Sequence, residues 1–395
     1  MDEATDEQYT SPFSPGYGKQ PLVFGGHERE IVELTDVFDS LDFGENHSVL
    51  LSGLRGAGKT SMLSLLQNAA ADRGWLVISE DASRGLMKRV MNSTIPTLIG
   101  GLESSTKARL TGFNLWKFGA NWEYEDRARE AVPQLRNDLV ALSAARDGRG
   151  ILITIDEVSS GKVRLRELSE FAVQVSHALN DGANIMIVFA GIKVDIDELI
   201  KQEHTTFLRR SRDLDFRRLS PSETRRVLAE TSELGGRRIE PAALELLVSI
   251  SQGYPYLVQL AGDYAWRNNQ TARIITLPDA KVALDRAIRA VQSRVISKVY
   301  LDLSDQDREF LAAMAVDEGR TRTADIRDRM QVSDQYVQIY RRRLIDSGYV
   351  QPDGHGYVRF SLPYLDRYIR TVVGITPDPE DDVPDEWAHY PAPEL

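Results

Sequence analysis

A glycine-rich loop between an expected strand and an expected helix constrains the fold of this chain more than any other feature. Residues 53–60 read Gly-Leu-Arg-Gly-Ala-Gly-Lys-Thr and fit the pattern G-x-x-x-x-G-K-[ST]. The apolar residues 48–52 before the loop predict a buried strand, and residues 61–67 after it predict a helix. In that setting the pattern is a P-loop, whose glycines let backbone N–H groups approach a phosphate closely. The sequence therefore predicts a parallel α/β sheet, with helices on both faces, that binds a nucleoside triphosphate.

The residue types of the loop predict how it would hold its ligand. The ammonium group of Lys59 would contact the β- and γ-phosphates, and the hydroxyl group of Thr60 would contact Mg²⁺. The N–H groups of the loop would point at the phosphates, as they do at a helix N-terminus. The nucleotide contacts predicted along the loop are Gly53, Arg55, Gly56, Ala57, Gly58, Lys59, Thr60 and Ser61.

A second expected strand ends in two carboxylates. Residues 151–155 are all apolar or β-branched, as in a strand buried on both faces of a parallel sheet, and Asp156 and Glu157 follow them. Ligands of such sheets bind at the carboxyl ends of the strands. Asp156 would hold Mg²⁺ through water, and Glu157 would orient or deprotonate the water that attacks the γ-phosphate. An ordinary strand that ends in an acidic turn is the alternative.

The next expected strand, residues 184–191, ends without a polar side chain. Many P-loop ATPases have Asn, Ser or Thr there to position the attacking water, whereas this strand ends in Ala190 and Gly191. The sequence therefore predicts slow hydrolysis.

Together these motifs resemble those of AAA+-type P-loop ATPases, close to the origin-recognition ATPases and the STAND signalling ATPases. The resemblance covers residues 21–370 and implies ATP or ADP and Mg²⁺ as ligands. Residues 23–31 are similar to the segment that precedes the P-loop in this family and packs around adenine, which implies that Phe24 and Gly25 contact the base. His27 stands where the family usually has Arg, and we expect it to be solvated at a helix start.

Two further segments resemble the family more loosely. Residues 251–257 look like the Gly-x-Pro signature of STAND lids, which implies that Pro255 belongs to the nucleotide site. The alternative is an ordinary turn between two helices, in which Gly and Pro only end one helix and start the next. Residues 207–216 look like the arginine-finger region, in which an arginine reaches a neighbouring molecule's γ-phosphate, and a solvated basic loop is the alternative. The arginines that compete for this role are Arg209, Arg210 and Arg212.

Composition and resemblance divide the chain of 395 residues into five segments. A disordered tail is expected at residues 1–20 and an acidic, Pro-rich disordered tail at residues 372–395. Between the tails we expect a P-loop ATPase core at 21–205, a helical lid at 206–300 and a winged helix-turn-helix at 301–371.

The expected winged helix-turn-helix consists of three helices and a hairpin, with Ser304, Thr323 and Ser333 at the helix starts. Its third helix would point Gln and Arg side chains outward, where they could contact base edges of duplex DNA. The candidate DNA contacts are Gln335, Gln338, Arg341, Arg342 and Arg359, with Arg343 as a further phosphate contact. Residues 303–370 contain eleven acidic residues and eleven arginines, so the module is neutral, whereas DNA-binding modules are usually basic. Contact with a protein is therefore the alternative.

The remaining composition restricts the class of protein. The chain has no Cys, so disulfides and Cys zinc sites are excluded. No run of about 18 apolar residues is present and the start of the chain is acidic, which predicts a cytoplasmic protein that neither spans a membrane nor begins with a signal peptide. The net charge is −11, of which seven charges lie in residues 377–395. That tail and an aromatic hairpin expected near residues 109–123 are candidate surfaces for protein partners.

The function predicted from these observations is an ATP-binding switch. It would hydrolyse ATP slowly with Mg²⁺, move its lid and winged helix with nucleotide state, and form ATP-dependent homo-oligomers if an arginine acts on a neighbour. The alternative is a DNA-binding protein, similar to a replication initiator or a regulator, in which ATP is mainly a structural ligand.

Overall fold

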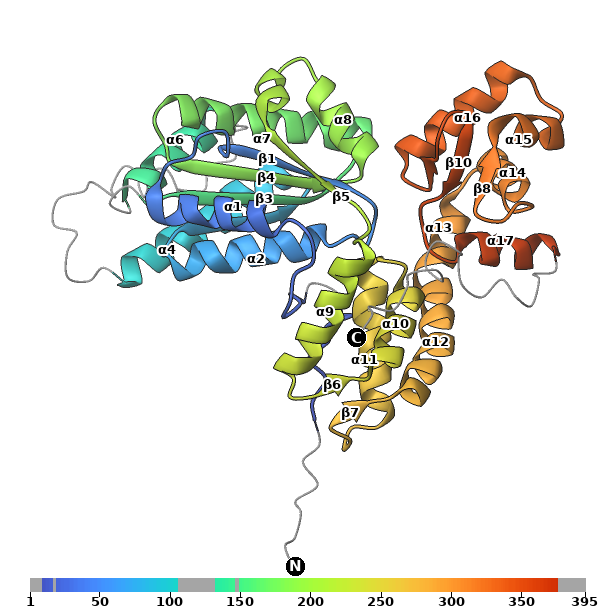
Figure 1. The fold of residues 1–395 in the computed structure, drawn as a ribbon. Coiled ribbons are helices and arrows are strands. Elements are labelled where there is room, and N and C mark those ends of the chain that lie inside the picture. Colours follow the sequence, from blue (N-terminus) through green and yellow to red (C-terminus); the bar gives the residue numbers. More distant parts are fainter. Residues whose placement is uncertain (1–8, 17–18, 106–131, 146–148, 376–395) are drawn as a thin grey trace, which may run out of the picture. The chain divides into compact units, whose positions relative to one another are not determined.

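The computed structural model describes residues 9–16, 19–105, 132–145 and 149–375, with only the backbone for residues 101–105 and 132–134 (Figure 1). The predicted aromatic hairpin and most of the acidic tail lie outside these ranges. The chain forms two compact units. The first, here called the sheet unit, comprises Glu30–Ser52 and Leu65–Leu214, and the second, here called the lid unit, comprises Met1–Arg29, Gly53–Ser64 and Asp215–Leu395.

The sheet unit is built on a five-stranded sheet in the order β2-β3-β4-β1-β5. The strands are β1 (Ser48–Gly53), β2 (Leu76–Asp81), β3 (Ile151–Val158), β4 (Ile185–Gly191) and β5 (Arg212–Phe216). The pairs β2–β3, β3–β4 and β1–β4 are parallel, so helices must connect the strands. α1 (Glu28–Ser40) precedes the first strand, and the connecting helices are α2 (Lys59–Asp72), α3 (Leu86–Arg89), η1 (Val90–Thr94), α4 (Ile95–Ser105), α6 (Val132–Ala145), α7 (Lys162–Asn180), α8 (Lys193–Lys201) and η2 (Thr206–Arg210). The predicted parallel α/β fold is confirmed.

Burial explains why the central strands are so apolar. All seven residues of β4 are buried, as are the first five of β3. Figure 1 shows α1 and α2 along one face of the sheet and α6 and α7 along the other. Strands covered on both faces have no solvent side, which favours continuous apolar runs over alternation.

The lid unit contains the helices of the lid predicted at residues 206–300. They are α9 (Pro221–Leu234), α10 (Pro241–Ser251), α11 (Pro255–Asn268), α12 (Leu277–Val291), η3 (Gln292–Ile296) and α13 (Ser297–Asp302), with short strands β6 (Arg238–Ile239) and β7 (Ile274–Ile275). A capping box joins Ser220 and Glu223 at the start of α9. Leu234, the last residue of α9, is 67% exposed, because the buried stripe of the helix runs through Thr231 and Ser232.

The C-terminal module of the lid unit follows. Its elements are α14 (Asp305–Met314), β8 (Arg320–Arg322), α15 (Thr323–Met330), α16 (Asp334–Asp346), β9 (Val350–Pro352), β10 (Tyr357–Phe360) and α17 (Leu365–Val373). The three predicted helices and the hairpin are present. Two elements were not predicted: β8, which pairs with β10, and α17. α17 continues to Val373, past the predicted end of the module. No helix in the described part of the chain is both long and apolar enough to cross a membrane.

Residues 9–14, here called the N-terminal strap, correct the expectation of a disordered start. Phe13 is 4% exposed and lies edge-on to Trp266, with ring centroids 6.2 Å apart. The indole N–H of Trp266 donates to the carbonyl oxygen of Tyr9 at 2.9 Å, and the N–H of Ser14 donates to Gln259 Oε1 at 3.0 Å. The Ser and Pro content suggested disorder, but burial of an aromatic ring offsets the loss of chain entropy that ordering requires.

Candidate nucleotide site

The glycine loop has the backbone conformation that its sequence predicts. It leaves β1 at Gly53 and enters α2 at Lys59. Gly53, Gly56 and Gly58 have φ angles of 141°, 72° and 102°, a region that residues with a Cβ rarely adopt. A Cβ on Gly53 would lie 2.2 Å from the carbonyl oxygen of Phe216. The glycines are therefore needed both for the path of the loop and for the close approach of its neighbours.

Lys59 lies inside this loop. Only 9% of the residue is exposed, and its ammonium group donates to the carbonyl oxygens of Gly53 at 3.0 Å and Leu54 at 2.6 Å. As the first residue of α2 it also stands at the positive end of the helix dipole. Positive charge and the N–H groups at the helix start therefore meet at the place where a phosphate would bind.

Aromatic side chains flank the loop within the lid unit. A Cβ on Gly58 would lie 3.9 Å from both Phe24 and Phe216. His27 stands directly before α1, as expected, but it is half-buried, with its ring 4.6 Å from that of Phe216. A Cβ on Gly25 would come within 2.8 Å of Leu219 and Val227, so residue 25 must be small. The structure thus brings the predicted Phe24 next to the loop and adds Phe216.

The Gly-x-Pro segment of the lid also reaches the loop. The hydroxyl group of Tyr254, the middle residue of this segment, donates to the carbonyl oxygen of Arg55 at 2.5 Å. Pro255 follows at the first turn of α11, where its fixed φ suits a helix start. Sequence reasoning missed Tyr254, because the middle position of the motif carries no residue preference. A tyrosine beside two helix-breaking residues was the only signal.

The carboxylates of β3 stand at a distortion of the strand. The register shifts between Ile155 and Val158, and Glu157 has a φ of 53°, which is unusual for a residue with a Cβ. The N–H of Glu157 donates to Asp156 Oδ1 at 2.8 Å, and the side chain of Glu157 is exposed. A bulge of this kind re-aims side chains, and bulges and strained residues cluster at functional sites.

Within the sheet unit, three strands end at one edge. Gly191 at the end of β4 is the register partner of both Ser52 in β1 and Val158 in β3. Asp156 and Glu157 therefore belong to the same edge of the sheet as Ser52, the residue directly before the glycine loop in the chain.

The end of β4 has no polar residue, as predicted, but a charged network lies beyond it. Lys193 Nζ lies 3.1 Å from Asp213 and 3.2 Å from Asp197, and the hydroxyl of Ser52 donates to Asp213 at 3.0 Å. Burial alone would lower the pKa of Lys193, but its hydrogen bonds and attraction to the two carboxylates outweigh this and raise the pKa. Lys193 is therefore a charged but already paired cation.

The three candidate finger arginines differ in their surroundings. Arg212 forms an ion pair with Glu33 and donates to Asn46 at 3.1 Å, with only 15% of its side chain exposed. Arg209 and Arg210, on η2, are exposed. Arg212 is therefore part of the sheet unit's own structure, and the other two are the arginines accessible to a partner.

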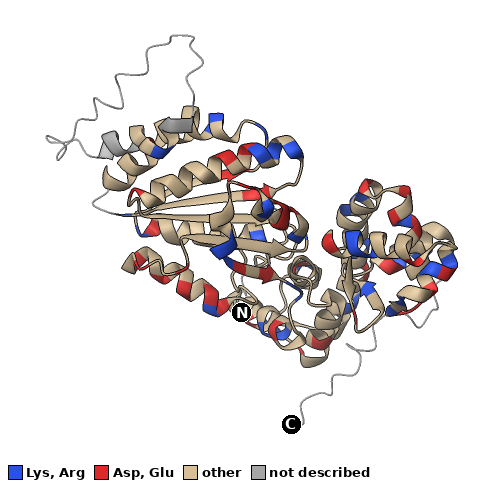
Figure 2. Cartoon of the chain, turned by 90° about the horizontal axis from the view of Figure 1, so that it is seen from above, with Lys and Arg blue, Asp and Glu red and all other residues tan. Residues whose placement is uncertain are grey.

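The candidate DNA contacts lie on or near α16. Gln335, Gln338 and Arg342 are exposed, whereas Arg341 and Arg359 are half-buried. Two observations count against a DNA-reading surface. Arg343 forms an ion pair with the buried Asp307 at 2.9 Å, and Ile339 on the same helix is 62% exposed. Figure 2 shows both signs of charge over this module.

Comparison of the sequence with family models finds a match in the first half of the chain. The model described as the AAA ATPase domain matches residues 23–188, which contain the loop, β3 and most of β4. Over these residues the chain is similar to AAA-type P-loop ATPases. A second model, described as a domain of unknown function, matches residues 294–369, and no curated protein matches the chain.

Two solved structures share the fold of nearly the whole chain. A Walker-type ATPase of Pyrococcus abyssi is 17% identical, with a TM-score of 0.62, and the match covers 88% of this chain and 96% of that one. The ORC2 protein of Aeropyrum pernix, in ADPNP–ADP complexes, is 16% identical, with a TM-score of 0.60, and the match covers 91% and 96%. At these identities the likeness shows the fold alone.

Proposed function

We propose that this protein is an AAA-type ATPase that acts as an ATP-dependent switch, hydrolyses ATP slowly and changes the position of its C-terminal module with nucleotide state. The observation that carries the proposal is the glycine loop itself, with three residues at positive φ, a buried lysine and an aromatic flank. The ORC2 protein of the same fold was solved with adenine nucleotides, which supports ATP and ADP as the ligands.

The residues divide the chemistry between them. Lys59 and the loop N–H groups would bind the phosphates, and Phe24, Gly25 and Pro255 would border the nucleotide. Thr60 and Asp156 supply a hydroxyl and a carboxylate oxygen, the donor types that Mg²⁺ prefers. Mg²⁺ would neutralise charge on the β- and γ-phosphates, and Glu157, exposed at the bulge of β3, would orient the attacking water.

Slow turnover follows from what surrounds these residues. β4 ends without a side chain that could hold the water, and the cation beyond it, Lys193, is paired with two carboxylates. Arg209 and Arg210 would act on a second copy of the chain, so turnover should depend on assembly. In related phosphoryl transfers, an arginine supplied in this way increases kcat by a factor of about 10³–10⁵.

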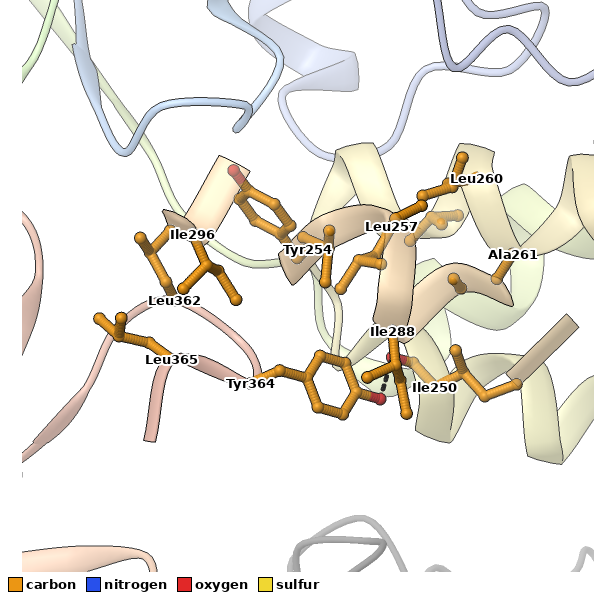
Figure 3. Close-up of a cluster of buried hydrophobic side chains, with 14 of the residues drawn as sticks. Ile250, Tyr254, Leu257, Leu260, Ala261, Ile288, Ile296, Leu362, Tyr364 and Leu365 are labelled. Carbon is orange, nitrogen blue, oxygen red and sulfur yellow. Dashed lines mark hydrogen bonds between the residues drawn. The ribbon is translucent and has the colours of Figure 1, made fainter. Parts of the chain in front are cut away.

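Contacts inside the lid unit support the coupling. The hydroxyl of Tyr364, in the C-terminal module, donates to the carbonyl oxygen of Ile250 in α10 at 2.7 Å. In Figure 3, Tyr364 lies beside Ile288 and Leu362 lies beside Ile296, so side chains of both parts share one apolar cluster. The order of elements α14, β8, α15, α16, β9 and β10 suits a winged helix-turn-helix.

The first test separates nucleotide binding from turnover. Lys59→Ala removes an ammonium that would make two charge-assisted hydrogen bonds to phosphate, so we expect the Kd for ATP to rise about 100-fold or more. Lys162→Ala removes an exposed lysine and is the matched control. Glu157→Gln should bind ATP as tightly as the unmodified protein and lose turnover. ATPase activity at the unmodified level in Glu157→Gln would refute that role.

A second test concerns assembly. If an arginine acts in trans, the ATPase rate per molecule rises with protein concentration, and Arg209→Ala or Arg210→Ala abolishes the rise. A rate independent of concentration would remove the oligomer from the proposal.

The alternative function, binding of duplex DNA, rests on the exposed Gln335, Gln338 and Arg342 of α16. A gel-shift series at increasing salt tests it, because phosphate contacts make affinity fall steeply with salt. Binding that weakens in this way, and is lost in Arg342→Ala, would favour DNA over a protein partner.

A further inference from the structure

We propose that Tyr254 is a positioning residue of the nucleotide site, which holds the peptide between Arg55 and Gly56 in the orientation that binds phosphate. The inference rests on the proposed function, because it concerns how the same loop receives ATP. It adds a lid residue that touches neither phosphate nor base, and that acts through the loop backbone.

The hydrogen bond that Tyr254 makes is well protected. Tyr254 is 1% exposed, and its hydroxyl lies 2.5 Å from the carbonyl oxygen of Arg55. In Figure 3 the hydroxyl points out of the apolar cluster in which its ring lies. Burial raises the pKa of this phenol, so the group stays protonated and acts as the donor. A buried hydroxyl that lost this acceptor would be left unsatisfied, which favours retention of the contact.

The hydrogen bond to the carbonyl oxygen of Arg55 also influences the opposite side of the same peptide, where a phosphate would bind. In a planar trans peptide the C=O and the N–H of the next residue point in opposite directions. The contact with Tyr254 fixes the C=O of Arg55, and it therefore also fixes the N–H of Gly56, which points the other way. An N–H held in place before the ligand arrives costs less entropy on binding than one that must be ordered.

Tyr254 packs so closely against the loop that position 56 has no room for a side chain. A Cβ on Gly56 would lie 2.3 Å from the Tyr254 hydroxyl oxygen, so the tyrosine occupies the space that any other residue at position 56 would need. Glycine is thus required at position 56 for two reasons, the φ of 72° and the tyrosine.

The lid holds Tyr254 rigidly. Gln252 and Gly253, directly before it, have φ angles of 46° and 68°, and the N–H of Tyr254 donates to Ser251 at 2.9 Å. The carbonyl oxygen of Gly253 accepts from the N–H of Leu219 at 2.7 Å. Tyr254 is therefore attached to the end of α10 and the start of α11, so the position of these helices bears on the orientation of the loop peptide.

Tyr254→Phe keeps the ring and removes the hydroxyl. We expect the Kd and the KM for ATP to rise about 2- to 10-fold, the factor that corresponds to one net hydrogen bond, with kcat unchanged. The control is Tyr256→Phe: its ring packs edge-on to Tyr254, its hydroxyl contacts Arg294, and its removal should leave the Kd unchanged. Melting temperatures without ATP report any general loss of stability separately.

A second variant, Gly56→Ala, tests the same contact with Tyr254 left intact, and so does not depend on the stability of Tyr254→Phe. Gly56→Ala should weaken ATP binding by itself, because its Cβ would lie 2.3 Å from the hydroxyl oxygen and 2.8 Å from Cζ of Tyr254. In the double variant Gly56→Ala/Tyr254→Phe the two losses should not add, because both changes disturb the same contact. Equal ATP affinity of Tyr254→Phe and the unmodified protein, or strictly additive losses in the double variant, would overturn the inference alone. Failure of the unmodified protein to bind ATP would overturn the proposed function together with it.

Discussion

The N-terminal strap offers a direct measure of how the lid unit is stabilised. Phe13 is 4% exposed, lies against Trp266, and fills the space beside Gly262, where a Cβ would come within 2.4 Å of its ring. Truncation of a buried phenylalanine to alanine costs about 3–5 kcal/mol. For a unit of about 150–250 residues, 1 kcal/mol lowers the melting temperature by about 2–4 °C. Phe13→Ala should therefore lower the melting temperature of the lid unit by about 6–20 °C, measured by circular dichroism.

The control for Phe13→Ala lies nine residues further on. Leu22 is also apolar but is 59% exposed, and Leu22→Ala should change stability by less than about 0.5 kcal/mol. If Phe13→Ala lowers the melting temperature no more than Leu22→Ala does, residues 9–14 do not pack on the lid in solution, and the reasoning from burial is wrong.

Two other predictions concern single residues. Gly253→Ala would place a Cβ 2.1 Å from the carbonyl oxygen of Leu219, at a positive φ. Gly319 has a similar φ but open space around it, so Gly319→Ala is the control. In urea unfolding, Gly253→Ala should lower the free energy of unfolding by more than about 1 kcal/mol beyond the loss in Gly319→Ala. Arg212→Ala should destabilise the sheet unit by about 1–3 kcal/mol, because it breaks a largely buried ion pair, and Arg209→Ala by less than about 0.5 kcal/mol. Equal midpoints in either pair would contradict the corresponding assignment.

The sequence predicted the features that local patterns encode. The glycine loop, the apolar β3 and the helix start at Ser304 each depend on a few neighbouring residues, and each is present in the structure. Features that depend on distant partners were missed. Tyr254 lies 199 residues from Arg55 in the chain, and no periodicity marks such a pair. Composition alone also wrongly predicted disorder for residues 9–14, because whether a segment is ordered depends on whether its aromatic ring can be buried against a distant part of the chain.

The hydrogen bond between Tyr9 and Trp266 has a consequence for synthesis of the protein. The two residues are 257 positions apart in the chain. At a translation rate of about 5–20 residues per second, the ribosome needs about 13–50 s to add the intervening segment. During that time the strap emerges first and has no partner, so the lid unit can complete its core only after α11 has left the ribosome. The sheet unit, whose last strand precedes the lid helices, can form earlier.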